Sequence, residues 1–282
     1  MLSLRPRQCQ QKLRLNLSRH EVGFEISPLK LATWNVNSLN VRLPHVLDWL
    51  EANQPDVLCL QETKQEDPRF PYQELSAVGY HALHSGQKTY NGVAILGRQL
   101  QTNQLAGIPN FADEQKRVVA TNIDDLRIIC AYIPNGQSLD SDKYQYKLRW
   151  LKALTTWLES ELKTYPKLVL LGDYNIAPED RDVHDPEAWI GQVLVSEPER
   201  AAFRQLVELG LHDAFRLFEQ PEGSFSWWDY RMAGFRRNLG MRIDHILVST
   251  PLIKQCKSCR IDIAPRKLER PSDHTPVVLE LA

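Results

Sequence analysis

The stretch LVLLGDYN, residues 168–175, decides how the rest of the chain is interpreted. Its four consecutive apolar residues indicate a strand that is covered on both faces. Gly172 permits a sharp exit from this strand. Asp173 and Asn175 are two positions apart, so their side chains point to the same side of an extended chain. The stretch therefore predicts a buried strand that delivers a carboxylate and an amide to the rim of a sheet.

Strand-like and helix-like segments alternate along the whole chain. Helices are expected over about 43–54, 142–163 and 196–210, where apolar residues recur at helical spacing. Ser196 and Glu199 form a capping box at the start of the third helix. Strands are expected over 29–34, 56–61, 93–96, 117–123, 126–133, 168–171, 242–248 and 275–281, and residues 63–90 are expected to be mostly loop. Because no linker separates these segments, we expect one α/β domain over residues 29–282.

Residues 1–28 differ from the rest of the chain. They hold five basic and two acidic side chains and show no regular periodicity. This composition predicts a basic, disordered N-terminal extension. The alternative is a basic arm that helps to hold nucleic acid.

Composition excludes some classes of protein and leaves others open. The 282 residues are 43% hydrophobic and 24% charged, and the net charge is -1. No apolar stretch reaches the roughly 20 residues that span a bilayer, so no membrane contact is expected. Five cysteines at irregular spacing fit a reduced, cytoplasmic setting. Nothing indicates an oligomer, so a monomer is the default expectation, and the global charge alone would not suggest DNA.

Polar residues stand at the ends of most expected strands. A single residue of this kind is usually a turn residue. A layered sheet system that gathers the whole set at one rim would instead build a site. The set is Asn35, Asn37, Glu62, Tyr132, Asn135, Asp173, Asn175, Asp244, Asp273 and His274.

The chemistry that this set suggests is metal-assisted hydrolysis of a phosphodiester. Mg²⁺ prefers oxygen ligands, and Glu62 is the best candidate, with Asn37 and Asp273 beside it. Asp173 with Asn175 suits the orientation and deprotonation of a water molecule.

The transition-state charge on phosphate requires hydrogen-bond donors as well. Asn35, Asn135 and His274 are suitable donors. A carboxylate such as Asp244 would orient the imidazole of His274 and favour its charged form.

The motifs that surround these residues identify a family. The chain resembles the exonuclease III family of abasic-site endonucleases, within the endonuclease/exonuclease/phosphatase superfamily. The resemblance spans about residues 29–282 and leaves residues 1–28 outside. It is carried by ATWNVNSL (32–39), LQETK (60–64), NGVAIL (91–96), AYIPNG (131–136), GDYNIAP (172–178), FSWWDYR (225–231), RIDHIL (242–247) and SDHTPV (272–277).

The resemblance implies a fold and an activity. The fold would be a four-layered α/β sandwich of two packed mixed β-sheets flanked by helices. The enzyme would be a Mg²⁺-dependent DNA repair phosphodiesterase, with Mn²⁺ as a substitute, acting on double-stranded DNA in base excision repair. It would cleave 5′ to abasic sites, remove 3′-blocking groups and act as a 3′-to-5′ exonuclease.

The resemblance also implies a role for each polar residue. Glu62 would bind Mg²⁺, while Asn37 stands where some relatives carry an aspartate. Asp173 would activate the water or protonate the leaving group, with Asn175 orienting it and both within reach of the metal. The residues that would contact the scissile phosphate, directly or by supporting His274, are Asn35, Tyr132, His274 and Asp244.

Residues 221–243 are both aromatic and basic. By the resemblance, Trp227 and Trp228, with Ile243, would line the pocket for a flipped, baseless sugar. Core packing is the alternative for each tryptophan. The arginines expected to contact DNA phosphates are Arg231, Arg236, Arg237 and Arg242.

Two loops carry weaker hypotheses about DNA contacts. Lys88 and Tyr90, in a loop before a strand, are candidates for contact with the DNA backbone. His184 follows the Asp173 motif, and its bulk would crowd the pocket for the abasic sugar. That crowding would favour 3′-end processing over internal cleavage.

Three other functions compete with this interpretation. The first is an exonuclease or phosphatase that acts at 3′ ends with little abasic endonuclease activity. The second is a superfamily phosphoesterase with another substrate, such as a nonspecific DNase, an inositol phosphatase or a sphingomyelinase. The third is a catalytically silent DNA-binding module, which would have lost at least one catalytic residue.

Overall fold

The computed structural model describes residues 28–282, so the expected extension lies outside the described residues except for Pro28. Fourteen strands and four α-helices make up this part of the chain. The strands are β1 (Leu29–Asn35), β2 (Val57–Gln61), β3 (His81–Ser85), β4 (Val93–Gly97), β5 (Thr102–Ala106), β6 (Val118–Ile123), β7 (Leu126–Tyr132), β8 (Leu168–Asp173), β9 (Leu211–Asp213), β10 (Trp227–Trp228), β11 (Gly240–Met241), β12 (Asp244–Ser249), β13 (Cys256–Ile261) and β14 (Val277–Leu281). The helices are α1 (Leu39–Asn53), α2 (Tyr72–Ala77), α3 (Asp142–Thr164) and α4 (Glu197–Glu208).

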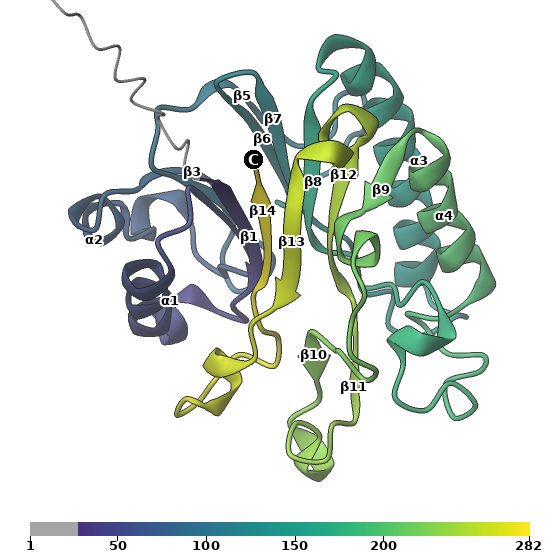
Figure 1. Ribbon diagram of the computed structural model, residues 1–282. Helices are drawn as coiled ribbons and strands as arrows, with labels where there is room; N and C mark the ends of the chain where they lie inside the picture. Colours follow the sequence, from purple (N-terminus) through teal and green to yellow (C-terminus); the bar gives the residue numbers. More distant parts are fainter. Residues whose placement is uncertain (1–27) are drawn as a thin grey trace, which may run out of the picture.

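Two six-stranded sheets pack face to face between two layers of helices (Figure 1). The strand order is β13-β14-β1-β2-β4-β3 in the first sheet and β5-β6-β7-β8-β12-β9 in the second. Both sheets are mixed, because β1–β2 and β7–β8 are parallel pairs among antiparallel neighbours. The predicted four-layered α/β sandwich is confirmed.

Helices cover the outer face of each sheet. In Figure 1, α1 and α2 lie outside the first sheet, and α3 and α4 lie outside the second. Ser141 caps α3 by accepting a hydrogen bond from the backbone N–H of Tyr144. The predicted capping box of Ser196 and Glu199 is present at the start of α4. No helix among residues 28–282 is long and apolar enough to cross a membrane.

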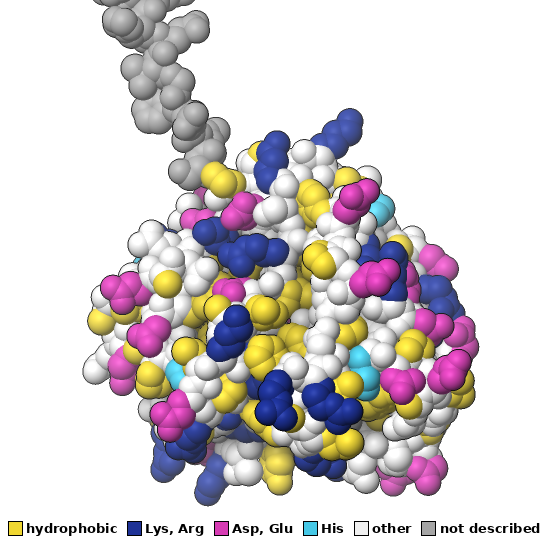
Figure 2. All heavy atoms as spheres, turned by 60° about the horizontal axis from the view of Figure 1, so that its bottom comes forward, with side chains coloured by type: hydrophobic (Ala, Val, Ile, Leu, Met, Phe, Trp, Pro, Cys, Tyr) yellow, Lys and Arg dark blue, Asp and Glu magenta, His cyan; other side chains and the backbone are white. Residues whose placement is uncertain are grey.

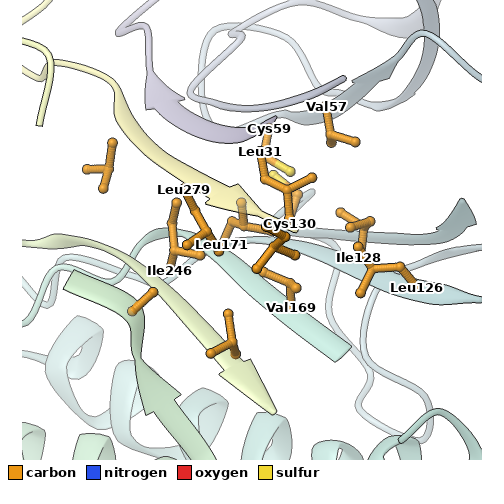
Figure 3. Packing of buried hydrophobic residues seen from close by; sticks show 14 of the residues in the cluster. Leu31, Val57, Cys59, Leu126, Ile128, Cys130, Val169, Leu171, Ile246 and Leu279 are labelled. Atoms are coloured by element: carbon orange, nitrogen blue, oxygen red, sulfur yellow. The ribbon is translucent and has the colours of Figure 1, made fainter. Parts of the chain in front are cut away.

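The main core lies between the two sheets (Figure 3). Leu31 and Cys59 reach into it from the first sheet, and Cys130 and Val169 from the second. All six residues of β8 are buried, as expected for a strand covered on both faces. This burial on both faces explains why the apolar runs of the central strands are continuous rather than alternating.

Some elements differ from the sequence-based expectation. Gly172 lies inside β8 rather than at its exit, and a Cβ there would come within 1.8 Å of Ala131 O on β7. The glycine is therefore required by the close approach of two strands. The stretch 63–90, expected to be mostly loop, contains α2 and β3. The strand expected over 242–248 begins only at Asp244.

Strand register brings the polar ends of the sheets together. Asp173 is paired with Tyr132 on β7 and with Asp244 on β12. In the first sheet, Asn35 is paired with Gln61, so Glu62 follows directly beside it. These strand ends lie at the end of the sandwich where β10 and β11 are seen in Figure 1.

Candidate active site

Asn35 joins the two sheets at the centre of the site. Its Nδ2 donates to Glu62 Oε1 at 2.9 Å and to Asp173 Oδ2 at 2.8 Å. The phenol of Tyr132 also donates to Glu62 Oε1, at 2.8 Å. The structure therefore brings together four residues that the sequence analysis placed at separate strand ends.

His274 and Asp244 form the predicted pair. His274 Nδ1 lies 2.8 Å from Asp244 Oδ2, and Ser226 Oγ donates to the same oxygen at 2.7 Å. On its other side, His274 Nε2 lies 3.7 Å from Asp173 Oδ2. Burial alone would lower the pKa of His274, but the carboxylates of Asp244 and Asp173 raise it to about 10. His274 is therefore a charged donor at neutral pH.

Asp173 has the protonation behaviour of a general base or acid. Burial raises the pKa of this carboxyl group to about 7, and the opposing influence of His274 and of Asn35 only limits the rise. Its other oxygen accepts a hydrogen bond from the backbone N–H of Asn175 at 2.9 Å. A carboxyl group with this pKa exchanges a proton readily near neutral pH.

Asn175 and Asn135 form a pair of carboxamides beside Asp173. Asn135 Nδ2 donates to Asn175 Oδ1 at 2.9 Å, and Asn175 Nδ2 donates to Ile133 O at 3.0 Å. The backbone of Asn175 is in the left-handed region, with φ at 49°, which asparagine adopts more readily than most residues. Both predicted residues thus lie at the site.

The oxygens proposed for Mg²⁺ face a cation in the structure. Lys64 Nζ lies 2.8 Å from Glu62 Oε2 and 2.6 Å from Asn37 Oδ1. Burial would raise the pKa of Glu62, but Lys64 and Asn35 lower it below its usual value. An ionised carboxylate and an amide oxygen that share one positive charge fit the hard-oxygen ligand set of Mg²⁺.

Asp273 is hydrogen-bonded to Asn37 and to Trp227. Its Oδ1 accepts from Asn37 Nδ2 at 2.9 Å, and its Oδ2 accepts from Trp227 Nε1 at 3.0 Å. Ligand atoms of Asp173, Asp244 and His274 also lie within 4.8 Å of one another. Since His274 is charged and hydrogen-bonded to Asp244, Glu62 and Asn37 fit a metal better than this second group.

The two tryptophans of the aromatic segment have different surroundings. Trp227 is partly exposed, and its ring centroid lies 6.5 Å from that of His274. Trp228 is only 2% exposed, donates to Asn238 Oδ1 at 3.0 Å and packs edge-on against Phe235. The position of Trp227 fits the predicted pocket, and that of Trp228 fits the packing alternative.

An apolar cluster adjoins Trp227. Ile243 packs there with Met241, Val183 and Ala177. The sequence analysis did not select Met241. Its pairing with Trp227 across β10 and β11 could be recognised only once the hairpin was known.

The arginines of this segment divide into exposed and buried ones. Arg236 and Arg237 are exposed, and Arg231 is 85% exposed in its side chain and paired with Asp229. Figure 2 shows Lys and Arg side chains gathered over the lower middle of the face that carries this end of the sheets. The prediction that Arg242 contacts phosphate is wrong, because Arg242 is 1% exposed.

Arg242 instead anchors the loop that follows Asp173. Its Nε donates to Asp182 Oδ1 at 2.7 Å, and its NH1 group lies 2.8 Å from Asp213 Oδ2. Arg216 pairs with the same Asp182 carboxylate. The buried Asp182 and the partly buried Asp213 therefore balance the charge of Arg242 inside the protein.

His184 lies in this loop and is half-buried. Its Nδ1 is 3.1 Å from Gly240 O, next to Met241 of the apolar cluster. It also lines a cavity of about 1100 Å³ together with Phe225 and Arg237. Lys88 is exposed and borders a smaller hollow.

Comparison with known proteins places the chain in a family. The model of the endonuclease/exonuclease/phosphatase family matches residues 32–274. The chain belongs to this family. Exodeoxyribonuclease III of Haemophilus influenzae is 37% identical over 266 residues, which cover 89% of this chain and 99% of the relative. The DNA repair nuclease APEX1 of Danio rerio is 31% identical and is covered to 82%.

Solved structures agree with this placement. A 3′ phosphatase from Neisseria, bound to a product DNA hairpin, matches with a TM-score of 0.89 and 47% identity, over 90% of this chain and 99% of that one. An AP endonuclease from Archaeoglobus fulgidus matches with a TM-score of 0.87 and 40% identity, over 90% and 99% of the two chains. The predicted resemblance and the prediction of a nuclease are confirmed.

Proposed function

We propose that this nuclease acts on double-stranded DNA in base excision repair, cleaving 5′ to abasic sites and processing 3′ ends with one site. The observation that carries the proposal is the hydrogen-bonded set of Asn35, Glu62, Asp173, Asp244 and His274. A catalytically silent DNA-binding module would not need this set complete. The names of the relatives support DNA repair as the setting.

The residues of the set divide the work of hydrolysis. Asp173, whose pKa is about 7, takes a proton from the attacking water, whose oxygen forms a bond to phosphorus as the P–O3′ bond breaks. The charged His274 donates to the phosphate oxygens, where negative charge develops. Asn35 gives both of its amide hydrogens to Glu62 and Asp173, so it would donate to the phosphate only by releasing one of them. Asp244 keeps His274 oriented and charged.

A metal ion would be held by the oxygens next to Lys64. Glu62, with Asn37 and Asp273, would hold Mg²⁺ or Mn²⁺, which when bound neutralises charge on the phosphate and the leaving oxygen. Lys64, which contacts Glu62 and Asn37, must then move aside.

The proposal is tested with end-labelled duplexes. One carries an internal abasic analogue and the other a recessed 3′-phosphate, and each is incubated with Mg²⁺ and with EDTA. Both reactions are expected to need Mg²⁺ and to fall at least about 100-fold in Glu62→Gln. Glu159→Gln, which changes an exposed glutamate paired with Lys163, is the matched control. Activity that persists in EDTA or in Glu62→Gln would refute the metal-dependent mechanism.

A second candidate is an enzyme that acts at 3′ ends with little abasic endonuclease activity. It is supported by the half-buried His184, which contacts Gly240 next to Met241 of the apolar cluster, where its bulk would narrow a pocket for a baseless sugar. The 47% identity to the Neisseria 3′ phosphatase also supports this second candidate.

The His184→Gly variant distinguishes the two candidates. If His184 limits the size of the pocket, the ratio of internal nicking to 3′-phosphate removal should rise about tenfold in the variant. A small change in the shape of a pocket gives discrimination of this size. His212, which lies on β9 and hydrogen-bonds Thr250, provides the control substitution. An unchanged ratio in the His184 variant would show that this histidine does not set the preference.

We further propose that the protein works as a cytoplasmic monomer with one domain over residues 29–282. The main core, to which both sheets contribute side chains, supports one domain (Figure 3). Light scattering coupled to gel filtration tests the monomer, and a mass of twice the chain's 32.5 kDa would contradict it. Limited proteolysis tests the domain, and two stable fragments would contradict it.

A further inference from the structure

Lys147 is a buried ammonium group beneath the site, and the mechanism above does not use it. It lies in α3 and is 0% exposed. Its Nζ donates to Asn175 O at 2.6 Å, to Asn135 O at 3.2 Å and to Glu199 Oε1 at 2.5 Å. An ammonium group has three N–H donors, so all of them are used.

Glu199 balances the charge of Lys147 and is equally buried. Its Oε1 also accepts from Leu194 N at 3.1 Å, and its Oε2 accepts from Ser196 N at 3.1 Å and Ser196 Oγ at 2.6 Å. The carboxylate is therefore fully hydrogen-bonded. Burial lowers the pKa of Lys147, and the nearby Glu199 carboxylate opposes this shift.

The two carbonyl groups that Lys147 holds belong to Asn135, which we propose donates to the phosphate, and to Asn175, which we propose orients the attacking water with Asp173. Asn135 follows β7 and Asn175 follows β8. The backbone turns sharply after each strand, with positive φ at Gly136 (98°) and Asn175 (49°). A Cβ at Gly136 would lie 3.4 Å from Lys147 Cδ, so the turn after β7 packs directly against this side chain.

We propose that Lys147 is a positioning residue for the reaction. By holding both carbonyl groups, it sets the backbone of the two turns and so keeps the carboxamides of Asn135 and Asn175 joined beside Asp173. Stability alone does not require a buried ion pair, because apolar residues of similar volume often serve as well. This inference rests on the proposed roles of Asn135 and Asn175.

The test removes both charges at once. Lys147→Met with Glu199→Gln keeps similar volumes and leaves no unpaired charge behind. We expect kcat for 3′-phosphate removal to fall about 30- to 100-fold, the size of effect that a small misplacement causes, while KM changes less than about threefold. Hydrogen–deuterium exchange should become faster in the turns at 133–137 and 174–178, whereas a purely structural role would not move kcat in the folded enzyme.

A second buried ion pair provides the matched control. Arg127 at the start of β7 and Glu161 on α3 lie 2.8 Å apart, with side chains 3% and 14% exposed. Arg127→Met with Glu161→Gln should lower the melting temperature by a similar amount and leave kcat unchanged. A comparable loss of kcat in this control would assign the effect to general destabilisation and overturn the inference.

Asn175→Ala separates this inference from the proposed function. If Asn175→Ala is inactive and the double variant at Lys147 and Glu199 retains kcat within twofold, only the positioning role fails. If Asn175→Ala is fully active, the proposed role of Asn175 fails first. Should the double variant not fold, Lys147→Arg retains the ion pair but moves the donors, and an unchanged kcat there would also count against positioning.

Discussion

The floor of the active site and its rim differ in how they are built. The floor comes from strand ends that register fixes, and its side chains are largely buried and hydrogen-bonded to one another. The rim comes from short turns whose arginines extend into solvent. The floor consists of Asn35, Glu62, Asp173, Asp244 and His274, and the rim of His184 and residues 227–238.

This difference fits the two functions that we propose for the site. Groups that stabilise a transition state must be held before the substrate arrives, and the buried network of the floor does this. Groups that bind a long charged polymer need reach and exposure, and the rim provides them. Substitutions in the floor should therefore change kcat, and substitutions in the rim should change binding.

The largest effect is expected at the centre of the floor. Asp173→Asn removes the group proposed to accept the water proton, so kcat should fall about 1000-fold while DNA binding stays within a fewfold. Asp125→Asn makes the same chemical change at the exposed turn between β6 and β7, far from the site, and should be silent. If Asp173→Asn instead binds DNA more weakly and has an unchanged kcat, the expectation that floor substitutions act on kcat would be wrong.

A smaller effect is expected at the rim. Arg236→Gln and Arg237→Gln should each weaken DNA binding a fewfold and lower the slope of log K against log salt by about 0.9 for each phosphate that the variant no longer neutralises. The value of kcat should not change. Binding titrations at several salt concentrations give this slope, and Arg260→Gln on the edge strand β13 is the control. Equal slopes for all three variants would show that the rim arginines do not contact phosphate.

The last effect is on stability rather than on turnover or binding, and it concerns His245 beneath the loop that follows Asp173. Its Nε2 is 2.8 Å from Ile176 O and its Nδ1 is 2.9 Å from the guanidinium of Arg242, an arrangement that suits the neutral ring. Burial and Arg242 lower the pKa of His245 from 6.5 to about 4. Its contribution to stability is therefore complete above pH 6.5 and is lost progressively as the pH falls toward 4.

Denaturant unfolding at pH 7.5 and pH 5 measures this contribution. Each pH unit between the two pKa values is worth about 1.4 kcal/mol, so the free energy of unfolding should fall by about 2 kcal/mol more in the wild type than in His245→Gln. An equal fall in both proteins would show that His245 is already protonated in the folded state at pH 5.

The sequence predicted the floor better than the rim, for a physical reason. An apolar run that ends in Asp173 or Glu62 identifies a buried strand and its polar end without further context. Some strands of the sheets could not be predicted in this way. The strands β3, β5 and β13 are held by pairing with a neighbouring strand, and no apolar run in the sequence indicates where they lie.

The role of Arg242 was missed for a related reason. Its partner Asp182 is sixty positions away in the chain, and only the folded loop brings the two together. The basic composition of residues 221–243 suggested that Arg242 contacts DNA phosphate, whereas the structure buries its charge. The support that Lys147 gives to Asn135 and Asn175 was hidden in the same way, because it acts through backbone carbonyl groups that no residue type reveals.

The central place of β1 has a consequence for biosynthesis. This strand pairs with β2 on one side and with β14 on the other, and Trp34 Nε1 donates to the carbonyl of His274, a residue 240 positions later. A nascent chain on the ribosome exposes Asp173 and Glu62 long before it contains His274. An unfinished chain therefore lacks both His274 and the strand that completes the first sheet, and we expect it to have no nuclease activity.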